Sequence, residues 1–300
     1  MSSSATPRTI YTTVLDESQE DELLDWLSEN QWERYNVAYS RFAFRNQYTN
    51  IVVYKSHKLV VQGKKTEDFV QFVLEPYILK QAALGYEEVL HNEWFEEHAG
   101  MDESGKGDLF GPLITACVIA DHDQIEKFLS AGVKDSKQVS SDRVILQLAD
   151  KIKETGCVVE LMCVSMAKYN ELYTKFHSNM NILLGWMHCC SLKNALAKHR
   201  VPWGMLDQFS KQPIVQTMLN DPTFDLRTQT KAESDPVVAA ASIIARAEYV
   251  HQMQELSKLA GVTLMKGASK AVTEQAIELK QRLGQDEMKN FIKLHFKTAP

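Results

Sequence analysis

The chain has 300 residues, of which 44% are hydrophobic and 24% are charged, and its formal net charge is −6. This composition is typical of a folded soluble protein with one large or two medium domains, and it excludes a disordered chain. No apolar run reaches the roughly 18 residues that a membrane-spanning helix needs, and the opening MSSSATPRTI lacks the apolar core of a secretory signal.

The first eighty residues alternate between strand and helix signals, as in a small α+β domain. A strand at 10–15 precedes a helix at 16–30, and a second helix is expected from Thr66, whose hydroxyl suits an N-cap. Further strands are expected at 39–46, 49–56 and 58–64. These elements predict a domain at 1–80 with a curved antiparallel sheet, followed by a linker at 81–95.

Basic and aromatic side chains are concentrated in one part of this predicted domain. Between residues 31 and 65, seven basic residues stand against a single acid, although the chain is acidic overall. Such a segment is typical of a surface that binds nucleic acid. Strand alternation places Arg41 and Arg45 on the face opposite the two neighbouring phenylalanines, which predicts that both contact a phosphate backbone. The alternative is that both are solvated or paired with acids of the first helix.

From residue 96 onwards, strand and helix signals alternate repeatedly. Strands are expected at 96–102, 109–120, 157–164, 201–209 and 224–230. Helices are expected at 123–132 and 140–156, from Ser165, from Asn179, and at 236–261, where Pro236 suits the first helical position. The series predicts an α/β domain at 96–300, with a mixed sheet flanked by helices.

A glycine-rich stretch near the start of this domain superficially resembles a phosphate-binding P-loop. Gly100 to Lys106 spells G-x-x-x-x-G-K, but Gly107 stands where a P-loop needs a hydroxyl for its magnesium ion. Two carboxylates inside the stretch, Asp102 and Glu103, would also repel the phosphates that such a loop holds. The stretch therefore needs a different explanation.

Acidic residues stand at the ends of the expected strands. Asp102 and Glu103 end the first strand, Asp207 ends a later one, and Glu233 and Asp235 precede the long helix. Carboxylates that converge on one point repel each other unless divalent cations neutralise them, and oxygen ligands suit Mg²⁺ or Mn²⁺. Two such ions promote in-line phosphoryl displacement. The pattern therefore predicts metal-dependent chemistry on a phosphodiester.

Several longer motifs resemble those of the type 3 ribonuclease H family, ribonuclease HIII. They are D-E-S-G-K-G-D-L-F-G-P at 102–112, D-S-K at 135–137, L-D-Q-F around Asp207, and K-A-E-S followed by V-A-A-A-S-I-I-A-R up to Arg246. Type 2 relatives usually carry G-R-G where this chain has G-K-G. The N-terminal extension resembles the TATA-box-binding-protein-like domain of the family, so both features favour type 3.

The resemblance implies an endonuclease that cuts the RNA strand of an RNA–DNA hybrid with Mg²⁺ or Mn²⁺, leaving a 5′-phosphate and a 3′-hydroxyl. It implies that Asp102, Glu103 and Asp207 are metal ligands. Glu233, which stands in the K-A-E-S motif, would complete the catalytic acids, with Asp235 as its competitor.

Substrate contacts are expected from the glycine loop that follows the first acids. Reading RNA requires contact with the 2′-hydroxyl, and the backbone at Gly105 and Gly107 can approach a sugar closely. Ser104 and Lys106 belong to the same expected substrate-binding loop, with Lys106 placed to meet a phosphate. The alternative is a plain tight turn.

The D-S-K triplet is a second expected contact, through Ser136 and Lys137, although helix capping by Asp135 or Ser136 is the alternative. Two further features have simpler interpretations. The spacing of His177, His188 and His199 is interpreted as a coincidence of helix faces rather than a metal site. The C-terminal basic residues are interpreted as a solvated face or, alternatively, as the lining of a hybrid-binding groove; they are Lys266, Lys270, Lys280, Arg282, Lys289, Lys293 and Lys297.

Two rival functions remain open from the sequence. A structure-selective or DNA-cutting nuclease would need the acids but not the glycine loop, and a non-catalytic hybrid-binding protein would need an incomplete metal site. The five cysteines contain no C-x-x-C pair, which favours buried thiols in a reducing compartment. We therefore expect a cytoplasmic monomer that binds RNA–DNA hybrids, with no membrane contact and no obligate protein partner.

Overall fold

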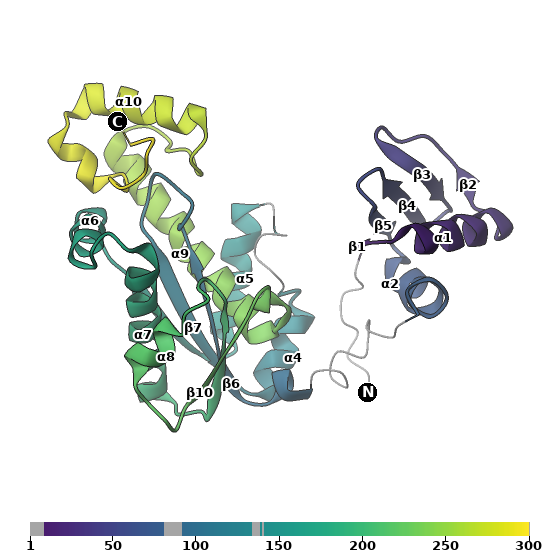
Figure 1. Ribbon diagram of the computed structural model, residues 1–300, viewed down its shortest axis with the longest axis horizontal. Coiled ribbons are helices and arrows are strands. Elements are labelled where there is room, and N and C mark those ends of the chain that lie inside the picture. The colour runs from purple at the N-terminus through teal and green to yellow at the C-terminus, as the bar shows by residue number, and fades with distance from the viewer. Residues whose placement is uncertain (1–8, 81–91, 134–138, 140, 300) are drawn as a thin grey trace. The chain divides into compact units, whose positions relative to one another are not determined.

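The computed structural model describes residues 9–80, 92–133, 139 and 141–299 (Figure 1). The chain divides into two compact units, Met1–Glu93 and Trp94–Pro300, called here the N-terminal unit and the catalytic unit. Most of the predicted linker, residues 81–91, lies outside the described residues.

The N-terminal unit is built on a five-stranded sheet in which neighbouring strands run antiparallel. Its order is β1-β5-β4-β3-β2. The strands are β1 (Ile10–Val14), β2 (Glu33–Arg34), β3 (Ser40–Arg45), β4 (Thr49–Tyr54) and β5 (Lys58–Gly63). The two-residue strand β2 was not predicted, because it is too short to show a side-chain period.

Helices cover one face of this sheet. Helix α1 (Glu17–Glu29) begins at a capping box formed by Asp16 and Gln19, and α2 (Thr66–Phe69) runs into the π-helical segment η1 (Val70–Leu79). All three pack on the same core as the inward side chains of β3, β4 and β5. The prediction that Thr66 caps a helix was wrong. Its hydroxyl instead donates to the carbonyls of Thr9 and Gly63, which ties the helix to the sheet.

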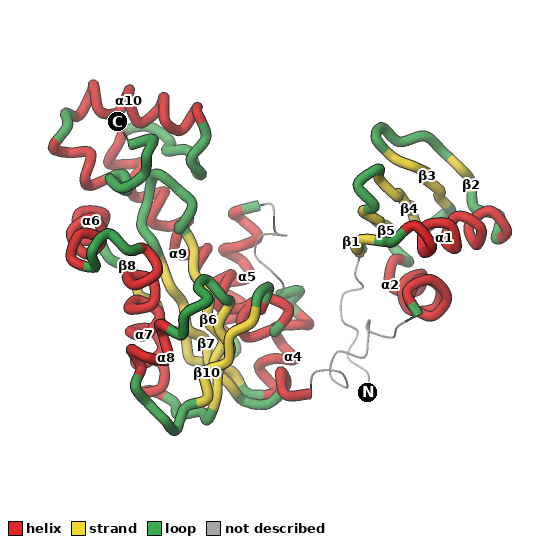
Figure 2. Tube along the Cα trace, in the orientation of Figure 1, coloured by secondary structure: helices red, strands yellow, loops and turns green. Residues whose placement is uncertain are grey.

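The catalytic unit has the predicted mixed sheet, in the order β10-β9-β6-β7-β8 (Figure 2). The strands are β6 (His98–Ser104), β7 (Ile114–Ala120), β8 (Val158–Cys163), β9 (Trp203–Asp207) and β10 (Asp225–Gln229). Strand β9 runs parallel to both β6 and β10, whereas β7 runs antiparallel to β6 and β8. The α/β fold expected from the sequence is confirmed.

Helices flank both faces of this sheet. On one face lie α4 (His122–Ser130), α5 (Asp142–Glu154) and α9 (Pro236–Ala260). Helix α10 (Lys270–Leu283) joins the same apolar core but lies beside the 3₁₀ turn η5 (Asp286–Asn290), beyond the ends of the strands (Figure 1). The other face carries α7 (Met180–Lys198) and α8 (Ile214–Leu219), with α6 (Met166–Lys175) packed on α7. Pro236 opens α9 and Gly261 ends it in the left-handed conformation, as predicted. The helices α8 and α10 were not predicted.

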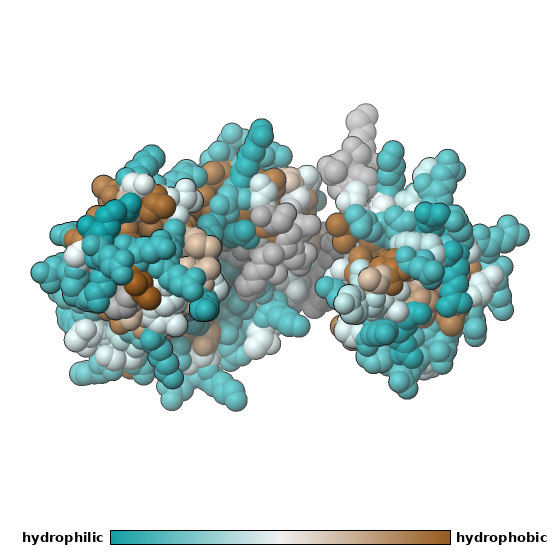
Figure 3. All heavy atoms as spheres, turned by 90° about the horizontal axis from the view of Figure 1, so that it is seen from above, coloured by the Kyte–Doolittle hydropathy of each residue, from teal (hydrophilic) through white to brown (hydrophobic). Residues whose placement is uncertain are grey.

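Surface polarity agrees with the composition. On the face drawn in Figure 3, the surface of each unit is mostly hydrophilic, and small apolar patches are scattered among the hydrophilic side chains. Among the described residues, no helix is both long enough and apolar enough to span a membrane.

Candidate active site

Two parallel strands bring the predicted acids together at one edge of the sheet. Met101 of β6 pairs with Leu206 of β9, so the residues that follow, Asp102 and Asp207, stand at corresponding positions of adjacent strands. Because both strands run the same way, their carboxyl ends meet at the same edge. Gly100 also lets α9 approach β6, since an added Cβ would lie 2.4 Å from backbone atoms of Val237 and Val238.

Asp102 is the most buried of the predicted ligands, with 4% of its surface exposed. Its Oδ1 accepts from the backbone N–H of Glu103 at 2.7 Å, and Ser242 of α9 hydrogen-bonds its carboxylate. Burial, followed by the charge of Glu103 and with a smaller part from Asp207, raises the pKa of Asp102 to about 8. Negative charge at this edge is thus costly unless a cation compensates it.

Glu103 has a different environment, because positive or donor groups contact both of its oxygens. Oε2 lies 3.2 Å from Nε2 of His188 in α7, and Oε1 lies 3.4 Å from Nζ of Lys106. Burial alone would raise the pKa of Glu103, but the His188 hydrogen bond and the charges of His188 and Lys106 outweigh it and lower the pKa. The Phe209 ring stacks on His188 with centroids 5.4 Å apart, and Lys106 Nζ lies 5.5 Å from the same ring.

The two competing acids before α9 occupy different positions. Asp235 is fully buried: it caps α9 by accepting from the N–H groups of Val237 and Val238, and its carboxylate lies 3.0 Å from Nε2 of His98. Glu233 stays partly exposed on the 3₁₀ turn η4 (Ala232–Ser234). This turn adjoins the acids, because Asp207 Oδ1 accepts from the N–H of Ala232 at 3.1 Å.

The glycine loop contains two glycines with different constraints. Gly105 has φ +85°, and a Cβ there would lie 2.2 Å from the carbonyl oxygen of Pro112, so this position requires glycine for folding. At Gly107, no described atom lies within 4 Å of an added Cβ. Ser104 ends β6 beside this loop, and the Lys106 side chain is 37% exposed. The tight-turn explanation therefore applies to Gly105 but does not account for Gly107.

The C-terminal segment around Lys293 hydrogen-bonds to the residues that follow the glycine loop. The Lys293 side chain is fully buried, and its Nζ donates to the carbonyls of Asp108, at 2.8 Å, and Gly111. The backbone N–H of Lys293 donates to the carbonyl of Leu109. The interpretation of the C-terminal basic residues as a solvated face or groove lining was therefore wrong for Lys293, because a β-bridge between Phe110 and Ile292 draws it inside.

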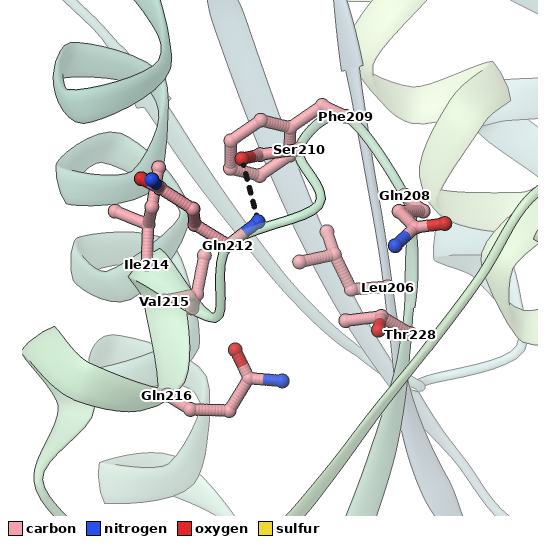
Figure 4. A pocket seen from close by; sticks show the side chains of 9 residues that line it. All are labelled: Leu206, Gln208, Phe209, Ser210, Gln212, Ile214, Val215, Gln216 and Thr228. Atoms are coloured by element: carbon pink, nitrogen blue, oxygen red, sulfur yellow. Dashed lines mark hydrogen bonds between the residues drawn. The ribbon is translucent and has the colours of Figure 1, made fainter.

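A small hollow of about 10 Å³ lies beside the end of β9 (Figure 4). Gln208, Phe209 and Ser210 of the loop after β9 line it, facing Ile214 and Gln216 of α8. Its volume is far below the range of about 300–1,000 Å³ that small-molecule sites usually have, so the hollow itself is too small to hold such a ligand.

The remaining predicted contacts have separate outcomes. Ser136 and Lys137 lie outside the described residues. Arg41 occupies a β-bulge, so the strand alternation that predicted a shared face with Arg45 does not apply to it. Its guanidinium lies 2.5 Å from the buried carboxylate of Glu20 in α1. Arg45 remains 48% exposed and pairs with Glu33 of β2 at 2.5 Å.

Three residues near the acids were missed by the sequence analysis: His188, Phe209 and Ser242. Phe209 and Ser242 lie inside the quoted motifs L-D-Q-F and V-A-A-A-S, which was a usable signal. His188 was noted only for its spacing from His177 and His199, which was interpreted as a coincidence, because its contact with Glu103 depends on how α7 packs on the sheet. Within the described part of the chain, no three acidic, histidine or cysteine side chains are arranged to hold a metal ion as they stand.

Comparison with known proteins identifies both parts of the chain. Residues 99–299 match the family model described as Ribonuclease HII, and residues 14–83 match a model described as a domain of unknown function, DUF3378. The catalytic unit is thus a ribonuclease H-type domain. A Ribonuclease HIII of Protochlamydia amoebophila is 36% identical over 96% of this chain and 95% of its own length. The chain therefore belongs to the ribonuclease HIII family.

Solved structures agree with this assignment. The crystal structure of Bst-RNase HIII in complex with Mn²⁺ has a TM-score of 0.65 and 27% identity, covering 97% of both chains. That of Aquifex aeolicus RNase H3 has a TM-score of 0.58 and 25% identity, covering 96% of this chain and 100% of its own. The resemblance drawn from the motifs, and the fold that it implied, are confirmed.

Proposed function

We propose that this protein is a metal-dependent endonuclease that hydrolyses the RNA strand of RNA–DNA hybrids and leaves 5′-phosphate and 3′-hydroxyl ends. The observation that carries the proposal is the convergence of Asp102, Glu103 and Asp207 at the carboxyl ends of two parallel strands, beside a glycine loop with open space at Gly107. Membership of the ribonuclease HIII family supplies the reaction.

The donor set fits a hard divalent cation, Mg²⁺ or Mn²⁺. Asp102, Glu103 and Asp207 offer oxygen atoms alone, and Glu233 on the adjoining turn would complete the set. Burial and the charge of Glu103 raise the pKa of Asp102, so a divalent cation held there would offset the cost of its negative charge. Bound there, such ions activate a water molecule and stabilise the charge that develops on the phosphate. The helix cap and the contact with His98 already engage the carboxylate of Asp235, which supports Glu233 as the fourth acid.

The chain's own groups orient the substrate. The backbone at Gly105 and Gly107 faces the ribose and reads its 2′-hydroxyl, since DNA lacks that group. Lys106 exchanges its contact with Glu103 for a phosphate oxygen, because its ammonium is partly exposed and the contact is long. Ser104 extends this contact surface, and Ser136 and Lys137 remain predicted contributors.

The N-terminal unit acts as a substrate-binding module. Its helices cover one face of the sheet, which leaves the opposite face for nucleic acid, and Arg45 lies exposed on β3. Arg41 belongs to the same region but neutralises Glu20, so we assign it a smaller share of the binding. We also infer a cytoplasmic monomer, supported by the five unpaired cysteines.

The test offers end-labelled RNA–DNA hybrid, double-stranded RNA and double-stranded DNA to the protein with Mg²⁺ or Mn²⁺, beside the Asp102→Asn variant. We expect cleavage of the RNA strand of the hybrid alone. The variant should bind hybrid with near-wild-type affinity and lose several orders of magnitude in cleavage rate, since metal stabilisation is worth several kcal/mol. Substantial cleavage by Asp102→Asn, or equal cleavage of all three substrates, would contradict the proposal.

A further inference from the structure

The two contacts to Glu103 differ in how firmly they are held. Lys106 belongs to the glycine loop, its side chain is 37% exposed, and its Nζ lies 3.4 Å from Oε1. His188 is fully buried in α7, with Nε2 3.2 Å from Oε2. A lysine that turns to a phosphate leaves Glu103, whereas the histidine stays. The position of Glu103 during the reaction therefore depends on His188.

The helix that carries His188 is fixed against the strands that carry Glu103. Glu103 pairs with Thr115 across β6 and β7, and the Thr115 hydroxyl lies 3.4 Å from that of Ser191. Ser191 stands one turn beyond His188 and donates to its carbonyl at 3.0 Å. Both hydroxyl groups are buried, so any slide of α7 along the sheet would break the contact between Thr115 and Ser191.

The plane of the His188 ring is fixed as well. The Phe209 ring stacks on it with an interplanar angle of 13° and centroids 5.4 Å apart. Phe209 follows Asp207 by two residues. The loop that begins at the predicted ligand Asp207 therefore supports His188, which contacts the predicted ligand Glu103. Lys106 lies over the same phenyl ring, 5.5 Å from its centroid.

The hydrogen-bond network decides which ring nitrogen of His188 carries the proton. Among the described residues, Nδ1 is buried with no hydrogen-bond partner, whereas Nε2 faces the Glu103 carboxylate. A proton on Nδ1 would be a buried, unused donor, but a proton on Nε2 is donated to a carboxylate oxygen. His188 thus donates from Nε2.

We propose that His188 is a positioning residue: its Nε2–H, held in plane by Phe209, fixes the carboxylate of Glu103 in the orientation that a divalent cation requires. The proposal rests on the function proposed above, in which Glu103 is a metal ligand. Hydrogen bonds to ligating groups typically contribute about 10- to 100-fold in metal affinity or activity.

The test compares His188→Asn with His188→Gln. Both side chains are amides, but the glutamine nitrogen reaches the place of Nε2, whereas the asparagine nitrogen reaches only that of Nδ1, which has no partner among the described residues. His199→Gln is the matched control, because His199 ends the same helix and its Nε2 lies 2.8 Å from Glu97 Oε1 in an exposed pair away from the acids.

Mn²⁺ binding is measured without nucleic acid, from the signal of the free ion in electron paramagnetic resonance, and kcat and KM for the hybrid are measured separately. We expect His188→Asn to bind Mn²⁺ roughly 10- to 100-fold more weakly. At fixed metal concentration its kcat should fall while KM stays unchanged. His188→Gln should recover most of the Mn²⁺ affinity, and His199→Gln should match the wild type.

Wild-type Mn²⁺ affinity in a folded His188→Asn variant would overturn the proposal. Equal losses in His188→Asn and His188→Gln would also overturn it, because they would trace to packing rather than to the donor. If His188→Asn loses its cooperative thermal unfolding, Phe209→Leu replaces it: we expect weaker Mn²⁺ binding, and unchanged binding would count against the proposal. A wild-type protein that binds Mn²⁺ but cuts no hybrid would contradict the proposed function and leave the His188 result intact.

Discussion

The buried charges of the catalytic unit and the exposed Arg45–Glu33 pair of the N-terminal unit are held in opposite ways. In the catalytic unit, Asp102, Asp235 and Lys293 are almost or fully buried, and each has fixed polar partners. In the N-terminal unit, Arg45 and Glu33 form a pair whose side chains are 48% and 63% exposed. Buried charges cannot rearrange cheaply, whereas exposed pairs can. The first arrangement suits chemistry at a fixed point, and the second suits a surface that exchanges partners.

An exposed pair also explains how an acidic chain can bind a polyanion. Such a pair contributes little to stability because water screens both charges, so Arg45 can leave Glu33 for a phosphate at little cost. Arg41 differs, because its partner Glu20 is 2% exposed and would remain buried with His57 as its other neighbour. The two arginines that the sequence analysis grouped together therefore differ, because Arg45 pairs with an exposed acid and Arg41 with a buried one.

The largest expected effect concerns the fourth acid of the catalytic unit. We expect Glu233→Gln to lower hybrid cleavage on the order of 10²- to 10³-fold, since it removes a charge from the metal site. Asp235→Asn should retain most of the cleavage, because an asparagine oxygen still accepts from Val237 and Val238. Cleavage rates at saturating hybrid, with matched thermal unfolding, decide between them. The reverse order would move the ligand to Asp235.

The next effect separates the two glycines of the loop. Gly107→Val should fold normally, since no described atom obstructs its side chain, yet cleavage should collapse because that side chain occupies the place of the ribose. Gly105→Ala should instead lower the melting temperature, because of its positive φ and the nearby Pro112 carbonyl. Thermal unfolding and cleavage are measured for both variants. Equal destabilisation would show that the whole loop is structural.

The sequence predicted the catalytic unit well where motif and element boundary coincide. Asp102 lies two residues before the end of β6 and Asp207 ends β9; both strands were visible from hydrophobic runs. Pro236 and Gly261 bounded α9 by their own backbone preferences. The parallel pairing of β6 with β9 then places Asp102 and Asp207 at corresponding positions. Local signals suffice when the functional residue and the element that carries it are neighbours in the chain.

The missed features depend on contacts between distant segments. His188 meets Glu103 across 85 positions, and Lys293 meets Asp108 across 185. The spacing of His188 and the charge of Lys293 were both noted but interpreted otherwise, because a helical histidine and a C-terminal lysine look alike in sequence whether buried or exposed. Arg41 was misplaced for a related reason: a β-bulge interrupts the alternation on which the prediction relied.

A smaller expected effect is a pH dependence of folding stability that comes from the buried Lys293 of the catalytic unit. Burial lowers the pKa of Lys293 to about 7, against 10.5 in the unfolded chain, while the charge of Asp108 opposes the shift. Between these values the unfolded chain binds the extra proton, so rising pH stabilises the folded state by up to about 1.4 kcal/mol per pH unit. Below pH 7, Lys293 is protonated in both the folded and the unfolded state, so the folded state bears the full free-energy cost of burying its charge.

Lys293→Met keeps the length of the side chain and removes the titration. We expect the wild type to gain stability relative to this variant as pH rises from 7 to 9, measured by urea unfolding at each pH. The nearby Tyr169 ring is present in both proteins, and the loss of hydrogen bonds to Asp108 and Gly111 is nearly constant over this range, so neither contributes to the slope. Burial and the charge of Lys293 lower the pKa of His295 from its ordinary value of 6.5, so its titration lies below this pH range. A pH-independent difference would contradict the lowered pKa of the buried Lys293.

The smallest effect tests the exposed pair of the N-terminal unit as a hybrid contact. In an Asp102→Asn background, which prevents cleavage, Arg45→Ala should weaken hybrid binding and reduce the log–log salt slope by about 0.9, the value for one phosphate contact on B-form DNA. Glu33→Gln is the matched control, because it frees Arg45 from its pair and should leave the slope unchanged or slightly steeper. Arg41→Ala is a poor substitute, since it would strand the buried Glu20 and disturb folding. Fluorescence anisotropy of labelled hybrid over a salt series measures all of these quantities. If Arg45→Ala leaves both affinity and slope unchanged, β3 does not contact the hybrid, and the exposed C-terminal lysines become the better candidates.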